Sequence, residues 1–410
     1  MLGRAEVSAL TFRATSALFH TLLFVGLSVG TLRAQEPASR ADAVEQAQAE
    51  KARQLRPYVP GKVEQYLNRA QQRLAGQLRF HPYFQSAYAG GGFTLGAGYR
   101  AAVSSYNTID FRGSYTFKNY KRLESEFVAP RLFKRQGHLT VVGGWREATQ
   151  VGYYGLGTST ELSDRANYGF KQLYGAATLG IRPRRTPFAL EAGVETSRWE
   201  QTPGSGSRSS VDEVYTPESL PGLGATITYL HSHATLGVDT RGNPGYARRG
   251  GSYSATVRDF SDIDDAYGFT RVDYEAIQHV PVLRETWVLS FRGAASTTGL
   301  KQDQQIPFFM LPAIGGGSSL RGYNSWRFRD RNSLLLQAEW RIMVNRYFDT
   351  AVFYDAGKVT AEARQLSLKD LRDDWGFGIR FHGPWSTPLR VDFAHGQEGL
   401  AINFSSSAAF

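Results

Sequence analysis

The chain has 410 residues, a net charge of +10 and no cysteine. The lack of cysteine fits an exported protein that needs no disulfides and equally fits a cytosolic one. The basic residues are scattered singly through the chain and form no Lys/Arg run, so the composition argues against a nucleic-acid partner. At this length several domains are common, but β-barrels reach the same size as one unit.

The N-terminus has the anatomy of a secretory signal peptide. A basic lead precedes an apolar core from about Ala17 to Val29, and small residues end at Ala34, after which we expect cleavage. A membrane anchor is the alternative, but this core is too short to span a bilayer and contains His20. No other segment approaches about 18 uninterrupted apolar residues, so a mature membrane protein would have to cross as a barrel.

Residues 35–77 are rich in Ala, Gln, Glu and Arg and predict a periplasmic arm of two short polar helices. Pro60 and Gly61 would open the second helix. The arm is too short to form a substantial folded domain.

Residues 78–410 alternate between apolar and polar positions, as β-strands do. In LLLQAEWRIMV the apolar face includes Trp340 and the opposite face Glu339, while TAVFYDAG places Val352 and Tyr354 opposite Asp355. A soluble β-sandwich would also alternate, so this pattern alone does not decide whether the apolar face meets lipid or a protein core.

Strand number and loop spacing favour a membrane barrel. We count about sixteen candidate strands, the first near Phe80 to Tyr88 and the last near Ala401 to Phe410, joined alternately by brief turns and by long loops. The long loops are expected at 148–168, 201–223, 298–332 and 358–373. Outer-membrane barrels have this asymmetry and an even strand number, which leaves both termini in the periplasm. The predicted fold class is therefore an all-β, transmembrane antiparallel barrel of about sixteen strands with a short helical arm.

Five short motifs resemble the Omp85 superfamily, which includes the BamA and TamA assembly barrels and two-partner-secretion transporters. GGGSSLRGY resembles the loop motif of that family, with Gly316, Gly317, Leu320, Arg321, Gly322 and Tyr323 at its positions. FYDAGKV, with Phe353, Asp355 and Gly357, and QAEWR, with Glu339, resemble its strand motifs. VDTRGNPGYARRGGSY, with Asp239, Arg241 and Gly250, resembles a turn motif, and YYGLG at 153–157 also fits.

The resemblance implies that the longest external loop folds into the lumen and that Arg321 meets acidic residues of the inner wall. Glu339 and Asp355 are the expected partners, because alternation points both away from the lipid-facing side. The alternative is a solvated surface loop with Arg321 in water. Phe410 resembles the C-terminal signal that the barrel-assembly machinery reads, and we expect it in the periplasmic aromatic girdle.

The resemblance also sets expectations for function. Assembly members carry POTRA modules, and the arm has no room for one, so the chain resembles a barrel-only member of the bacterial surface antigen type. We expect a non-enzymatic monomer of the outer membrane that acts in protein or lipid transport or assembly. Its partners would be membrane lipid, the barrel-assembly machinery and a client polypeptide or lipid. The alternative is a passive pore or structural barrel.

No enzyme motif stands out in the sequence. There is no nucleophile elbow of the G-x-S-x-G type and no glycine motif in a dinucleotide-binding context. His231 and His233 share one strand face, but no third metal ligand is placed nearby, so we interpret them as lumen-lining residues. We therefore expect neither a cofactor nor a metal.

Overall fold

A computed structural model describes residues 40–54, 61–62, 65–66, 69, 79–283, 285–345, 347–383, 386–406 and 409–410. The expected signal peptide and most of the second arm helix lie outside these residues. In the first part of the arm, α1 (Arg40–Gln54) is a helix, as its Ala- and Glu-rich sequence favours. Among the described residues, no helix has the length and apolar character needed to cross a membrane.

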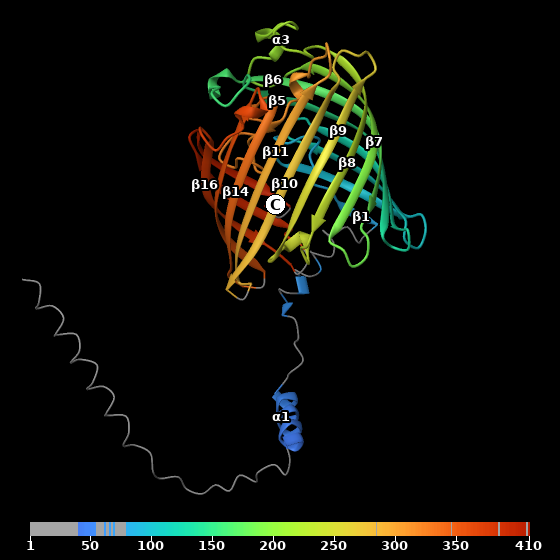
Figure 1. Cartoon of the computed structure of the whole chain (residues 1–410), viewed down its shortest axis with the longest axis vertical. Coiled ribbons are helices and arrows are strands. Elements are labelled where there is room, and N and C mark those ends of the chain that lie inside the picture. The colour runs from blue at the N-terminus through green and yellow to red at the C-terminus, as the bar shows by residue number, and fades with distance from the viewer. Residues whose placement is uncertain are drawn as a thin grey trace, which may run out of the picture. The chain divides into compact units, whose positions relative to one another are not determined.

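Sixteen strands form one antiparallel sheet in which each strand pairs with its neighbours in the chain (Figure 1). They are β1 (Phe80–Pro82), β2 (Thr94–Ala102), β3 (Thr108–Thr116), β4 (Lys121–Leu132), β5 (Gly137–Tyr153), β6 (Ala166–Ile181), β7 (Phe188–Pro203), β8 (Thr226–Asp239), β9 (Gly250–Asp262), β10 (Phe269–Leu283), β11 (Trp287–Leu300), β14 (Asn332–Met343), β15 (Phe348–Thr360), β16 (Arg372–Phe381), β17 (Leu389–Gly396) and β18 (Gly399–Ser405). The predicted fold class and strand number are confirmed.

The connections carry little regular structure. They contain the short helix α3 (Val211–Val214), the 3-10 turns η1 (Leu162–Asp164), η2 (Pro244–Tyr246), η3 (Phe308–Met310) and η4 (Ala363–Gln365), and the strand pair β12 (Ala313–Ile314) and β13 (Phe328–Arg329). The strand pair belongs to the connection between β11 and β14, the longest in the barrel. We call residues 301–331 the inner loop.

The two ends of the sheet do not meet in a ladder. Within the described residues, β1 pairs only with β2, and β18 pairs only with β17. The strands near this seam are also short: β1 has 3 residues, β17 has 8 and β18 has 7, whereas β5, β6 and β7 have 16 or 17. The wall is therefore lowest where the sheet is open.

The predicted first and last strands need correction. We expected the first strand to run from about Phe80 to Tyr88, but it ends at Pro82. The last strand was expected to reach Phe410, but it ends at Ser405. Aromatic residues continue to Tyr88 and Phe410 beyond these points, so the expected bounds overestimate both strands.

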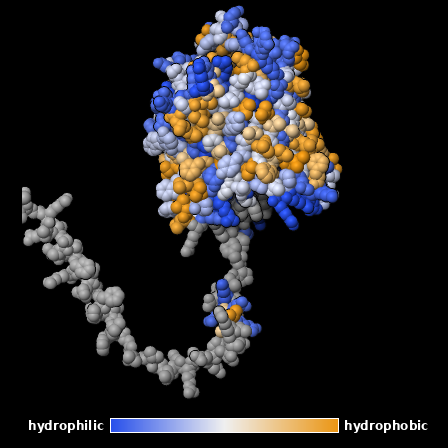
Figure 2. All heavy atoms as spheres, in the orientation of Figure 1, coloured by the Kyte–Doolittle hydropathy of each residue, from blue (hydrophilic) through white to orange (hydrophobic). Residues whose placement is uncertain are grey.

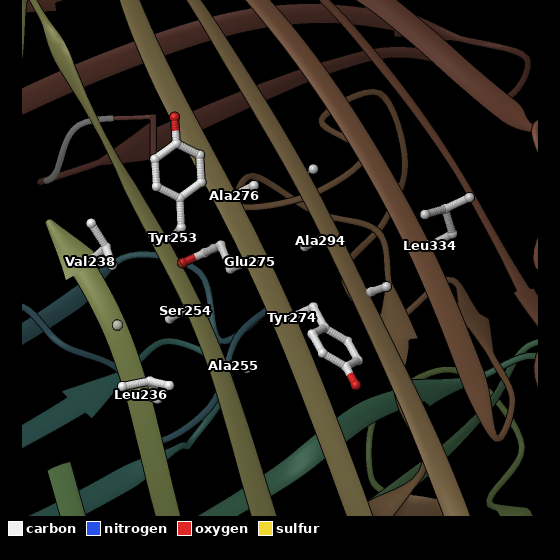
Figure 3. A pocket seen from close by; sticks show the side chains of 13 residues that line it. Leu236, Val238, Tyr253, Ser254, Ala255, Tyr274, Glu275, Ala276, Ala294 and Leu334 are labelled. Carbon is white, nitrogen blue, oxygen red and sulfur yellow. The ribbon is translucent and has the colours of Figure 1, made fainter. Parts of the chain in front are cut away.

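The outward face is apolar at the positions that alternation predicts. Trp340, Val352 and Tyr354 are 39%, 54% and 49% exposed, as side chains that meet lipid must be. Figure 2 shows hydrophobic residues along the middle of the wall and hydrophilic residues toward both ends. An outward groove of about 540 Å3 is lined by Leu236, Tyr253, Tyr274 and Leu334 over small side chains (Figure 3).

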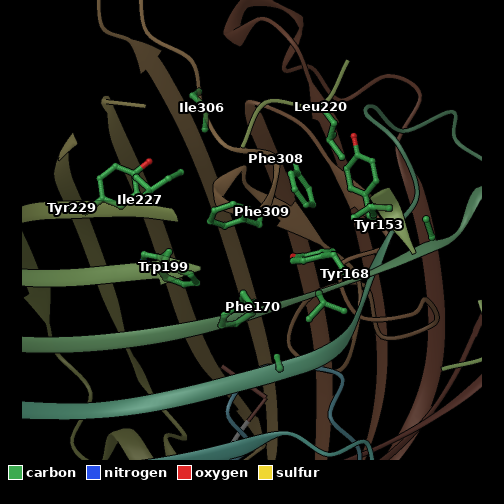
Figure 4. Packing of buried hydrophobic residues seen from close by; sticks show 14 of the residues in the cluster. Tyr153, Tyr168, Phe170, Trp199, Leu220, Ile227, Tyr229, Ile306, Phe308 and Phe309 are labelled. Carbon is green, nitrogen blue, oxygen red and sulfur yellow. The ribbon is translucent and has the colours of Figure 1, made fainter. Parts of the chain in front are cut away.

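An aromatic core fills the part of the lumen next to the external loops (Figure 4). The inner loop contributes Phe308 and Phe309, which are 1% and 4% exposed. The Phe308 ring centroid lies 4.9 Å from that of Tyr168 and 5.2 Å from that of Tyr153. Further members from the wall are Phe170, Trp199, Ile227, Tyr229, Phe260 and Phe269. The simple expectation that apolar residues face lipid and polar ones the lumen is wrong for this end, because the folded loops exclude water there.

Candidate functional site in the barrel lumen

The inner loop is attached to the wall through Arg321, which is 1% exposed. Its Nε and Nη2 donate to the two carboxylate oxygens of Asp355 on β15, each at 2.7 Å. Its Nη1 donates to Glu339 on β14 at 3.0 Å. The guanidinium carbon lies 3.5 Å from the ring centroid of Phe353. The structure thus brings four predicted site residues together, and the planar guanidinium matches the carboxylate bidentately.

Further charged side chains extend this anchor along the wall. Arg380 on β16 donates to Glu339 at 2.7 Å and lies 2.6 Å from Asp392 on β17. Arg390 lies 3.0 Å from Asp392. Asp374 on β16 faces Asp355 across the strand pair and is 1% exposed. We call Arg321, Arg380, Arg390, Glu339, Asp355, Asp374 and Asp392 the charged anchor.

The charged anchor holds more carboxyl groups than guanidinium groups. Three guanidiniums face four carboxyl groups, and all seven side chains are buried. Burial alone would lower the pKa of the Arg321 guanidinium, but hydrogen bonding and charge attraction from Asp355, followed by attraction from Glu339, raise that pKa above its ordinary value. Arg321 therefore stays charged between Asp355 and Glu339 although it is buried.

Glycines let the loop backbone approach the wall closely. Gly316 has φ of 95°, a conformation that favours glycine. A Cβ on Gly322 would lie 2.6 Å from the Asp374 Cβ, and one on Gly317 would lie 3.1 Å from the Asn403 amide oxygen. A Cβ on Gly357 would lie 3.0 Å from Ile314 of the loop. The glycine positions of the sequence motifs thus mark contacts between loop and wall.

Apolar packing supports the same attachment. Leu320 is fully buried in a cluster that also contains Tyr323, Phe328, Leu335 and Val359. The Tyr323 hydroxyl donates to the backbone carbonyl of Asp373 at 3.1 Å. Leu320 and Tyr323 therefore position the backbone on either side of Arg321.

The predicted turn motif lies elsewhere, at the opposite end of the strands. The Nε and backbone N–H of Arg241 donate to Asp239 at 3.1 and 3.0 Å, and Gly250 has φ of 85°. Within this turn, the Tyr246 hydroxyl donates to Asp349 of β15 at 2.6 Å, and its ring stacks on His382 at 4.1 Å. The turn connecting β8 and β9 thus reaches across the lumen, which the sequence pattern did not indicate.

Phe410 and the paired histidines are not part of the charged anchor. The Phe410 ring centroid lies 6.3 Å from that of His279, which faces the lumen, so this ring is not placed in the expected outer girdle. The rings of His231 and His233 are 5.7 Å apart, and His233 lies 3.7 Å from Glu191. In the part of the chain that the structure describes, no group of three or more His, Cys, Asp or Glu side chains is arranged to hold a metal.

Sequence reasoning missed the contribution of Arg380 and Asn403 to the anchor. The Asn403 amide on β18 donates to the Arg321 carbonyl at 2.8 Å. Both side chains lie on the lumen face of the alternating patterns GFGIRF and GLAINFS. Inward alternation identifies such residues as lumenal, but only the register between strands shows that they meet Arg321.

Comparisons with known proteins agree with this geometry. The Omp85 superfamily domain model matches residues 86–410. BamA from Haemophilus ducreyi lacking POTRA domains 1–3 is similar in structure, with a TM-score of 0.59 and 16% identity over 80% of this chain and 69% of that one. CdiB from Acinetobacter baumannii has a TM-score of 0.48 and 11% identity over 76% of this chain and 56% of that one. No curated protein sequence matches the chain.

Proposed function

The chain belongs to the Omp85 superfamily, and we propose that this outer-membrane barrel assists the insertion of unfolded polypeptides into the membrane at the seam between β1 and β18. The observation that carries the proposal is the seam itself. Strand edges with unpaired N–H and C=O groups are templates for another strand. In a finished barrel such edges are normally removed by closure.

The length of the strands beside the seam supports the same role. A membrane strand needs about 9 to 11 residues when tilted by about 45°. β17 and β18 have 8 and 7 residues, which is below that range. The lipid beside the seam therefore meets a shorter apolar wall, and a bilayer adapts to a short wall by becoming thinner. Insertion of a new strand is easier in such lipid.

The filled lumen argues against the alternative of a passive pore. The aromatic core packs the lumen near the external loops, and the Tyr246 turn crosses it near the opposite end. Solute diffusion would require both to move. A lateral path through the seam does not require the aromatic core to open.

The other parts of the proposal follow from this role. Residues 35–77 would form a periplasmic arm after removal of residues 1–34, and Arg321, Glu339 and Asp355 would fix the inner loop. The partners would be outer-membrane lipid, a client polypeptide and, during its own biogenesis, the barrel-assembly machinery. The proposed action is non-enzymatic and uses no cofactor.

The test uses the purified protein in liposomes and an unfolded eight-stranded outer-membrane barrel as the probe. A photoreactive residue replaces Ile402, which is 51% exposed on β18, or, as a control, Phe377, which is 55% exposed on β16. We expect faster probe folding than in empty liposomes and cross-links from position 402 but not from 377. Unchanged folding together with a wide, ohmic conductance in planar bilayers would instead establish a passive pore.

A further inference from the structure

The chain between β1 and β2 enters the lumen instead of continuing along the wall. Tyr83 and Ala87 are only 7% and 2% exposed. Four backbone carbonyls of this stretch accept hydrogen bonds from side chains of β3, β4 and β5 and of the turn between β3 and β4. These pairs are Gln85 with Ser114 at 2.7 Å, Ser86 with Arg122 at 3.4 Å, Ala87 with Arg146 at 3.4 Å and Gly90 with Lys118 at 2.7 Å. We call residues 83–92 the inner segment.

The inner loop contacts the inner segment through Trp326. The rings of Trp326 and Tyr88 stack with centroids 4.4 Å apart and an angle of 10° between their planes. The indole N–H donates to the carbonyl of Ala89 at 3.0 Å. One residue earlier, Ser325 lies against Gly90, where a Cβ would be 3.1 Å from its own. The loop is therefore attached to the β1 side of the seam.

The same loop is attached to the β18 side only a few residues earlier. The Arg321 carbonyl accepts from Asn403 of β18, and the Gly317 carbonyl accepts from Arg390 of β17 at 2.6 Å. The two flanks of the seam, which share no ladder within the described residues, are thus both held by residues 317–326. We propose that this stretch is a clasp that closes the seam from inside and that the Trp326 contact with Tyr88 is where it opens.

Trp326 is the weaker attachment on two grounds. On the β18 side, Asn403 and Arg390 each donate one hydrogen bond to a loop backbone that the buried Arg321 guanidinium also fixes to Asp355 on β15 and Glu339 on β14. The β1 side depends on one aromatic stack and one indole hydrogen bond. Trp326 also has φ of 64°, a left-handed conformation that is strained for a bulky residue. Contacts with Tyr88 and Ala89 hold this strained backbone, so losing them lets the backbone relax. Release of the clasp therefore begins at Trp326.

A distance measurement tests the clasp without reference to activity. Because the chain has no cysteine, Leu95→Cys on β2 and Phe404→Cys on β18 allow two spin labels to be placed on outward side chains across the seam. In lipid, Trp326→Ala is expected to lengthen and broaden the distance distribution between the labels. Trp375→Ala removes an equally large side chain from the outer face and should leave the distribution unchanged. An unchanged distribution in Trp326→Ala overturns the clasp.

A disulfide tests the regulatory consequence, which rests on the proposed function. Gly90→Cys with Ser325→Cys would join the two attachments, since a Cβ on Gly90 would lie 3.1 Å from that of Ser325, slightly closer than the roughly 3.5 to 4.5 Å of a disulfide. We expect the oxidised protein to lose acceleration of probe folding and the reduced protein to regain it, with each single variant as control. If the disulfide forms and activity persists, the clasp does not regulate insertion. If Trp326→Ala widens the seam but wild type never accelerates folding, the clasp stands and the proposed function fails.

Discussion

At the scale of single residues, Arg321 decides the stability of the inner loop. Arg321→Ala leaves Asp355 buried without its guanidinium and leaves Glu339 with Arg380 alone, and removing one partner of a buried pair costs about 3 to 5 kcal/mol. We expect a lower unfolding temperature and a loop that proteases cut, in a barrel that still assembles. Arg321→Lys should restore the contact only in part, because an ammonium cannot bond bidentately.

Arg364→Ala is the matched control, because its side chain is 83% exposed and its ion pair is with a neighbour on the surface. A double-mutant cycle of Arg321→Ala with Asp355→Ala separates the pair from its surroundings. Additive effects would contradict the view that this pair anchors the loop.

For Asp374, another member of the charged anchor, we predict that a substitution raises the unfolding temperature. Its carboxyl faces Asp355 across the strand pair, and the charged anchor already has more carboxyl groups than guanidiniums. Burial and a neighbouring carboxylate both disfavour the ionised form of a carboxyl group, so the Asp374 carboxyl is a poor fit to this site. Asp374→Asn keeps the shape of the side chain and should raise the unfolding temperature, whereas Asp355→Asn should lower it. A loss of stability in Asp374→Asn would show that its charge is needed.

At the scale of elements, the register of β15 predicts opposite tolerance on its two faces. Val352 points outward and is 54% exposed, so Val352→Arg puts a charge in lipid at a cost of about 2 to 4 kcal/mol at mid-membrane depth. Val352→Leu should fold as wild type does. Glu191→Arg, at a lumen-facing position on β7 with a side chain 45% exposed, should also fold. Folding yields in lipid vesicles measure all three, and equal yields would contradict the register.

The aromatic core predicts a large effect of Phe308. Phe308→Ala removes a ring that is 1% exposed, and such a change costs about 3 to 5 kcal/mol in a packed core. The variant should unfold at lower temperature and show conductance steps absent from wild type. Phe117→Ala, at a position 81% exposed, is the control. If Phe308→Ala unfolds at the wild-type temperature and shows no conductance steps, the aromatic core does not fill the lumen.

Sequence alone predicted the strands of the wall better than it predicted the segments and side chains that fill the lumen. Alternation placed Val352 outside and Asp355 inside, because a period of two fixes both faces once one is known. The motif residues led to Arg321 and its two carboxylates. The inner segment was not predicted, since Tyr83 to Tyr88 was expected to continue the first strand. Contacts with Trp326 and with Arg122 of the neighbouring wall hold it inside. Aromatic residues such as Phe260 face the lumen because folded loops cover them, which no local pattern encodes.

At the scale of the whole molecule, the protein is expected to be exported before it folds. Cleavage after Ala34 should leave a mature chain beginning at Gln35, which N-terminal sequencing of outer-membrane fractions would detect. The extensive ladders between β2 and β17 should resist detergent, so unboiled protein should migrate faster than boiled protein. A mature chain recovered from the soluble periplasm would contradict both expectations.

The position of Arg321 in the chain determines when the charged anchor can form during assembly. Arg321 precedes all of its wall partners, and the last of them, Asn403, lies near the C-terminus. Strands that pair only with their sequence neighbours can join the barrel one after another. The inner loop, however, lacks one of its contacts until β18 has joined the sheet. A barrel interrupted before its final strand would therefore keep residues 317–326 loose. The inner loop can therefore be fully attached only after β18 has reached the barrel.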